Sequence, residues 1–193
     1  MQFSIFDQTL NSWEGSSLLL GILEEDISEQ IEKLEFILNS GLILEKIKDK
    51  NFKGEKGQHL SFDFLDEKLN TFSIIGLGKK DNINNDSLRD YLSEFARRIL
   101  DKEKKISILL PWELLDENAL KVAVESIRLS TFKDNRFNKK RNESNKLQEV
   151  EFILQNNLSG ISFKESEDIC EGVEFARRLV AAPPNSLTPL DMS

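Results

Sequence analysis

Two stretches of this 193-residue sequence carry side chains that could bind a metal ion or act as a base. Glu24, Glu25 and Asp26 form an acidic cluster, a possible metal site, but carboxylates in front of an apolar helical pattern are more typical of a helix start at a solvated turn. His59 is the only histidine, and nothing near it completes a catalytic dyad or a ligand set. We therefore interpret the acidic cluster as a cap and His59 as structural or exposed.

A glycine turn follows the apolar segment at 71–77 and precedes a helical pattern that starts near Asp86. A strand, a glycine turn and a helix start can together hold a phosphate group. Here Gly76-x-Gly78 lacks the third glycine of the dinucleotide fingerprint, because Asp81 stands in its place, and no Gly-Lys-Ser/Thr follows. We interpret the two glycines as a tight turn and not as a phosphate site.

The one basic stretch, residues 133–146, has six Lys/Arg against two Asp/Glu, and it interleaves with Phe132 and Phe137. Such a pattern could bind nucleic acid. The net charge of the whole chain is −8, which argues against a broad nucleic-acid or membrane surface, and polar Asn/Lys/Ser sequence is ordinary for a connecting loop. We favour a solvated loop and keep DNA binding as the minor hypothesis.

Common sequence motifs of catalytic and metal-binding sites are absent from the sequence. It has no His-Glu-x-x-His, no paired cysteines and no Gly-x-Ser-x-Gly, so we assign no catalytic, cofactor-binding or metal-binding residue. A single cysteine excludes an internal disulfide and fits a reducing compartment. No apolar run approaches the roughly 20 residues of a membrane helix, and residues 1–7 do not resemble a signal peptide. We predict a cytoplasmic protein.

Hydrophobic periodicity predicts the elements that would position any site. We expect strands at 2–6, 16–23, 58–64, 71–77, 106–110 and 146–155. We expect helices over 27–38, 42–50, 86–100, 116–129 and 166–182. This order predicts an α/β fold in which helices flank a mixed sheet.

Two of these helices carry further signals. Asp26-Ile-Ser-Glu29 resembles a capping box for the helix at 27–38, whose buried stripe would be Ile27, Ile31, Leu34 and Leu38. In the last helix an apolar stripe is formed by Ile169, Val173, Ala176 and Val180, with Cys170 and Leu179 beside it, whereas Arg177 and Arg178 point elsewhere. Pro183 and Pro184 end that helix.

The end of the chain resembles a known family. "FARRLVAAPPNSLTP" is similar to the Ala-Arg-x-Leu-Val-x-x-Pro-Pro-Asn-x-Leu-Thr-Pro signature of the leucyl (cytosol) aminopeptidases. Further resemblance lies in "IIGLGKKD" at 74–81, "SLRDYLSEFARR" at 87–98 and "AVESIRLSTFKDNRF" at 123–137. The last of these looks like a diverged form of a family segment, in which Ser126 replaces a glycine and Thr131 and Phe137 replace tyrosines.

The resemblance implies a domain organisation. We expect an N-terminal, macro-domain-like α/β domain at 1–163, a C-terminal linker helix at 164–182, and a connector at 183–193 into a catalytic domain beyond Ser193. The family's Gly-Lys-Gly-x-Thr-Phe-Asp-Ser-Gly-Gly and Asn-Thr-Asp-Ala-Glu-Gly-Arg motifs do not occur here. Those motifs would hold two divalent metals (Mn, Zn or Mg) in the catalytic domain, so this chain itself would bind no cofactor.

The function implied is that of the non-catalytic N-terminal domain of a cytosolic metallo-aminopeptidase. The parent protein would remove N-terminal amino acids, leucine preferred, from peptides, and this domain would aid assembly and active-site access. We expect the parent to be a homohexamer, this chain to be inactive and mainly monomeric alone, and part of the apolar face of helix 166–182 to lack cover. The alternatives are a stand-alone, macro-like ligand-binding module and a DNA-binding accessory domain.

Overall fold

The computed structural model describes residues 1–35, 40–64, 69–115, 118–137, 146–154 and 162–183. Its strands are β1 (Gln2–Phe6), β2 (Ser17–Leu23), β3 (His59–Asp63), β4 (Thr71–Gly78), β5 (Lys105–Leu109) and β6 (Glu149–Ile153). Its α-helices are α1 (Ile27–Glu32), α2 (Ser40–Asp49), α3 (Asn85–Ile99), α4 (Ala119–Thr131) and α5 (Lys164–Ala181). Short 3₁₀ turns are η1 (Leu10–Ser12), η2 (Lys80–Asn82) and η3 (Trp112–Leu114). None of the helices in this described part combines the length and apolar character of a membrane span.

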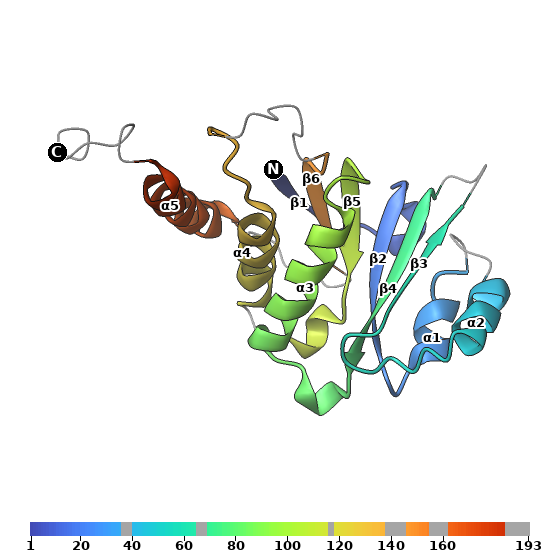
Figure 1. The fold of residues 1–193 in the computed structure, drawn as a ribbon. Coiled ribbons are helices and arrows are strands. Elements are labelled where there is room, and N and C mark those ends of the chain that lie inside the picture. Colours follow the sequence, from blue (N-terminus) through green and yellow to red (C-terminus); the bar gives the residue numbers. More distant parts are fainter. Residues whose placement is uncertain (36–39, 65–68, 116–117, 138–145, 155–161, 184–193) are drawn as a thin grey trace.

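The six strands form one sheet in the order β1-β6-β5-β2-β4-β3. All neighbours pair in parallel except β3, which runs antiparallel to β4 at one edge. The prediction of an α/β fold with a mixed sheet flanked by helices is therefore confirmed (Figure 1). The central strands β2 and β4 are buried along nearly their whole length, which explains their continuous apolar sequences.

Each face of the sheet has its own hydrophobic core. In β2, Leu19 and Leu23 belong to the core beneath α3 and α4, whereas Leu18, Leu20 and Ile22 belong to the core beneath α1 and α2. This alternation follows from the two-residue period of a strand. Figure 1 shows α3 and α4 side by side over the sheet, with α5 on the outer side of α4.

The predicted helix at 27–38 is wrong in its extent, because α1 ends at Glu32. Leu34 is fully buried as predicted, but it lies after the helix, and Leu38 lies outside the described residues. The predicted capping box is also wrong, because the Asp26 side chain makes no capping hydrogen bond. Its backbone has φ −127° and ψ 28°, not the extended conformation that directs a capping side chain back to the helix.

A capping box that the sequence pattern does not predict begins α3. The Asn84 side chain accepts a hydrogen bond from the Ser87 backbone, and the Ser87 hydroxyl accepts one from the Asn84 backbone. Leu88, Leu92, Phe95 and Ile99 are buried on the inner side of this helix. The helix at 86–100 is thus confirmed, with its start fixed at Asn85.

Candidate functional site

The described residues of the acidic cluster do not form a metal site. No group of three or more His, Cys, Asp or Glu side chains in the described part of the chain is arranged to hold a metal ion. Glu25 instead accepts a hydrogen bond from the backbone N–H of Lys80, at 3.3 Å from its Oε1. The cluster therefore links the start of α1 to the loop that follows β4.

The glycine turn uses its backbone donors within the protein. The Gly76 N–H donates to the Gln58 carbonyl and the Gly78 N–H donates to the Gly54 carbonyl, both at 2.8 Å. A Cβ on Gly76 would lie 2.1 Å from the Glu55 carbonyl oxygen, so only glycine fits against this neighbouring segment. These contacts support our interpretation of a structural turn.

His59 lies on β3 beside the aromatic ring of Phe95, with 6.1 Å between ring centroids. Its Nε2 is buried and has no hydrogen-bond partner among the described residues. Burial lowers the pKa of His59 below 6.5, and the nearby charge of Arg98 lowers it further. The imidazole is therefore held in its neutral form, which suits a structural residue.

We expect the stability of the chain to fall as the pH drops below about 6.5, the pKa of an unperturbed histidine. Because the folded-state pKa of His59 is lower, the unfolded chain binds the proton first and is favoured in that window. Thermal denaturation between about pH 7.5 and about pH 5.5 measures the effect. His59→Gln is the control, and an identical pH slope in that variant would contradict the assignment.

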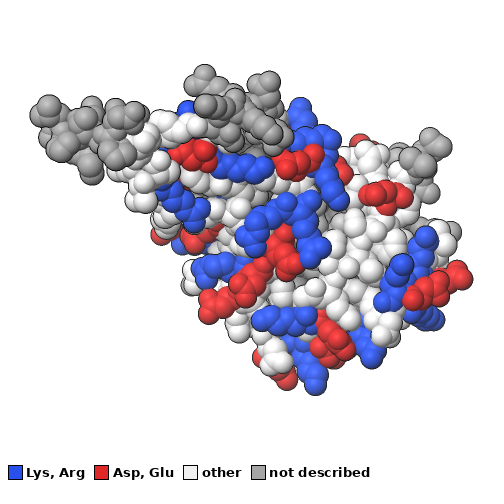
Figure 2. Space-filling model, in the orientation of Figure 1, with Lys and Arg blue, Asp and Glu red and all other residues white. Residues whose placement is uncertain are grey.

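Two of the described basic residues of the stretch, Lys133 and Arg136, are in ion pairs. Lys133 lies 3.6 Å from Asp101, and Arg136 lies 2.7 Å from Asp134. Arg136 holds the pKa of Asp134 at about 2, so this pair stays charged at neutral pH. Residues 138–145 lie outside the described part. Figure 2 shows both signs of charge interspersed over the visible described surface, which is unlike a nucleic-acid site.

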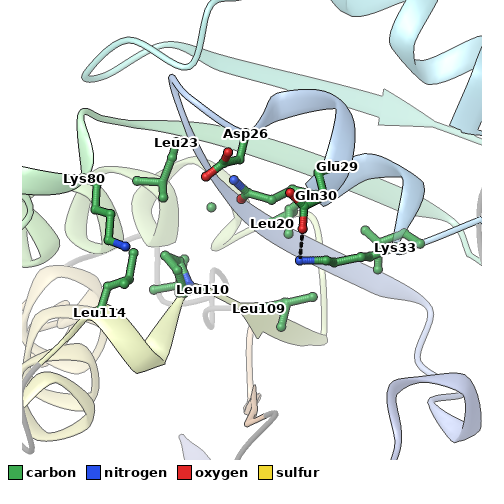
Figure 3. A pocket seen from close by; sticks show the side chains of 13 residues that line it. Leu20, Leu23, Asp26, Glu29, Gln30, Lys33, Lys80, Leu109, Leu110 and Leu114 are labelled. Atoms are coloured by element: carbon green, nitrogen blue, oxygen red, sulfur yellow. Dashed lines mark ion pairs between the residues drawn. The ribbon is translucent and has the colours of Figure 1, made fainter.

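A cavity of about 150 Å³ lies beyond the carboxyl ends of β2 and β5 (Figure 3). Leu20 of β2 and Leu109 of β5 are paired across the two strands and form part of its wall. The polar groups around it are Asp26, Glu29, Gln30, Lys33 and Lys80. The sequence does not predict this grouping, because Asp26 stands where a helix cap is expected and Lys80 follows another strand.

Helix α5 contacts α4 through polar side chains. The Arg128 guanidinium donates to both carboxylate oxygens of Glu174, at 2.8 and 3.2 Å, and to the Glu167 carbonyl at 3.2 Å. Arg177 donates to the Leu129 carbonyl at 2.7 Å. Of the apolar residues of α5, Cys170 is the one fully buried here, and burial raises the pKa of its thiol to about 11.

Three large apolar residues of α5 are exposed, and they lie among exposed charged residues such as Glu165, Asp168 and Glu171. Ile169, Phe175 and Val180 have exposed fractions of 48%, 59% and 89%, and we call these three residues the outer face of α5. The predicted stripe through Ile169 and Val180 thus points away from the domain, and the expectation that part of it lacks cover is confirmed. A contiguous exposed apolar patch marks an interaction surface, whereas apolar residues exposed singly are ordinary.

Comparison with known proteins gives relatives that are named cytosol aminopeptidases. Residues 19–141 match the family described as "Cytosol aminopeptidase family, N-terminal domain". The chain is 56% identical over its whole length to a "Probable cytosol aminopeptidase" of Prochlorococcus marinus subsp. pastoris, of which it covers 40%. It is 36% identical to the "Probable cytosol aminopeptidase" of a Synechococcus species, of which it covers 38%.

Solved structures share the fold. A tomato leucine aminopeptidase mutant matches 100% of the chain with a TM-score of 0.81 at 21% identity, over 40% of its own length. The bottromycin maturation enzyme BotP, in complex with Mn, matches 92% of the chain with a TM-score of 0.64 at 15% identity, over 34% of its length. The chain spans about 40% of the length of the curated relatives it matches. It belongs to the cytosol aminopeptidase family and corresponds to the N-terminal domain of that family.

Proposed function

We propose that this chain is the non-catalytic N-terminal domain of a cytosolic metallo-aminopeptidase. The parent protein would remove N-terminal residues, leucine preferred, from peptides. Two divalent metals (Mn, Zn or Mg) in its catalytic domain would activate water and polarise the peptide carbonyl. In support, the relatives are named cytosol aminopeptidases and are more than twice as long as this chain.

The observation that carries the proposal is the outer face of α5. The helix is fixed to α4 by Arg128 and Glu174, whose side chains are 22% and 12% exposed, so its orientation is set within the domain. That orientation presents Ile169, Phe175 and Val180 outward, on the helix that ends just before Pro183. We propose that this surface packs against the catalytic domain, with 1–163 as the domain, 164–182 as the linker helix and 183–193 as the connector.

The two alternatives have less support. The ion pairs of Lys133 and Arg136 argue against DNA binding by this stretch. If the chain does not change the mobility of DNA in a gel at low salt, the DNA-binding hypothesis is wrong. A stand-alone nucleotide-binding module would need phosphate donors, yet the Gly76 and Gly78 amides are already used. The proposed contact with a catalytic domain explains why the apolar side chains of the outer face of α5 are exposed in this chain. Neither alternative explains that exposure.

We expect the 193-residue chain to be monomeric and inactive. Light scattering should give a mass near 22.2 kDa, because the proposed hexamer forms through the catalytic domain. With Mn²⁺ added, the chain alone should not hydrolyse leucine p-nitroanilide, whereas a chain continued through the catalytic domain should. Turnover by the 193-residue chain that a chelator abolishes, or a hexameric mass, would contradict the proposal.

A further inference from the structure

The cavity beyond β2 and β5 lies where the topology of the sheet favours ligand binding. After β2 the chain passes to α1 on one face, and after the neighbouring β5 it passes to α4 on the other face. In open α/β sheets such divergence leaves a crevice outside the carboxyl ends of the strands, and ligands bind there. The position of the cavity therefore follows from the strand order.

The size of the cavity limits its ligand. Pockets for drug-sized molecules measure about 300–1,000 Å³. The volume here is about 150 Å³, similar to cavities that hold a single small ring, so a whole nucleotide would not be enclosed. The ligand should be a molecule of amino-acid size.

The lining indicates a molecule that has an apolar part and one charge of each sign. Leu20, Leu109 and Leu110 contribute apolar side chains, while Asp26 and Lys80 approach from separate elements, as Figure 3 shows. The Asp26 carboxylate makes no capping hydrogen bond to α1, and Glu29 and Lys33 form an ion pair with each other at 2.9 Å. A phosphate would meet the carboxylates of Asp26 and Glu29, whereas a zwitterion offers each sign of charge a partner.

We infer that this cavity binds a free amino acid with an aliphatic side chain. Its ammonium group donates to the Asp26 carboxylate, its carboxylate accepts from the Lys80 ammonium, and its side chain lies against the leucines. The inference goes beyond the proposed function, since binding needs no peptidase activity. If that function is correct, the ligand belongs to the class of products that the parent protein releases.

Titration of the 193-residue chain with L-leucine, followed by calorimetry or amide chemical shifts, tests the inference. We expect saturable binding, weakened about tenfold by Lys80→Met and by Asp26→Asn, because each change removes one charge-assisted contact. Lys79→Met is the matched control, since Lys79 is exposed and does not line the cavity. Neither cavity variant should change the melting temperature, because Asp26 does not cap α1 and Lys80 is exposed.

Two leucine analogues test separately the contact of the ligand carboxylate and the contact of the ligand ammonium group. Leucinamide lacks the carboxylate, and 4-methylpentanoate lacks the ammonium group, so both should bind the wild-type chain more weakly than leucine. The Lys80→Met variant should bind leucine and leucinamide equally, and the Asp26→Asn variant should lose its preference for leucine over 4-methylpentanoate. Absence of saturable leucine binding, equal binding by all variants, or tighter binding of AMP than of leucine would overturn the inference. None of these outcomes depends on whether the parent protein is a peptidase.

Discussion

Replacing Phe152 with alanine is expected to lower the free energy of unfolding by about 3–5 kcal/mol, the usual cost of removing a buried aromatic ring. Phe152 lies on β6 and is fully buried. Its ring stacks on Phe3 of β1 at 6.2 Å and meets Trp112 edge-on at 5.6 Å. It also contacts Phe163, the residue before α5, at 5.8 Å. The substitution therefore leaves a cavity where the sheet edge and the start of α5 are joined.

Chemical denaturation monitored by circular dichroism measures this loss. Phe137→Ala is the control, because Phe137 is 49% exposed and its removal should change the stability by less than about 0.5 kcal/mol. If Phe152→Ala were as mild as the control, the aromatic contact between β6 and the start of α5 would not be tightly packed. The same variant should also loosen α5, which hydrogen exchange across 164–181 would detect.

The strands and most helices could be predicted because their sequences carry the pattern locally. The buried strand at Ser17–Leu23 is a continuous apolar run, and α3 repeats apolar residues on one side. The end of α1 could not be predicted from the same pattern, since Leu34 continues the helical spacing but is buried after the helix has ended. The α3 cap was missed because Asn84 pairs with a serine, where the common box has Glu or Gln.

The surroundings of the candidate site depend on contacts between residues distant in sequence. Spacing alone shows that α5 is amphipathic, but it does not show which side faces α4. Arg128 on α4 binds Glu174 of α5, so the side of α5 that carries Glu174 faces α4 and the outer face of α5 points away from the domain. The cavity likewise requires the strand order, because Asp26 follows β2 and Lys80 follows β4, and both line one cavity only when these strands are neighbours.

Replacing Phe175 with aspartate is expected to leave the stability of the chain alone nearly unchanged but to destabilise the longer parent protein. In the chain alone Phe175 is 59% exposed, so the change should alter the free energy of unfolding by less than about 0.5 kcal/mol. In the parent protein we propose that the catalytic domain covers this ring. The lost apolar burial and the buried carboxylate should then together cost about 3 kcal/mol or more.

Thermal denaturation of both forms, together with aminopeptidase activity of the longer one, separates these cases. Cys170→Asp provides the contrast, because Cys170 is fully buried near Arg128 of α4 and a carboxylate there should destabilise the chain alone as well. A longer protein that tolerates Phe175→Asp without loss of melting temperature would show that the outer face of α5 is not covered by the catalytic domain. Because the two substitutions lie on one helix and introduce the same side chain, the contrast between them reports the direction in which each position faces, not the helix propensity of aspartate.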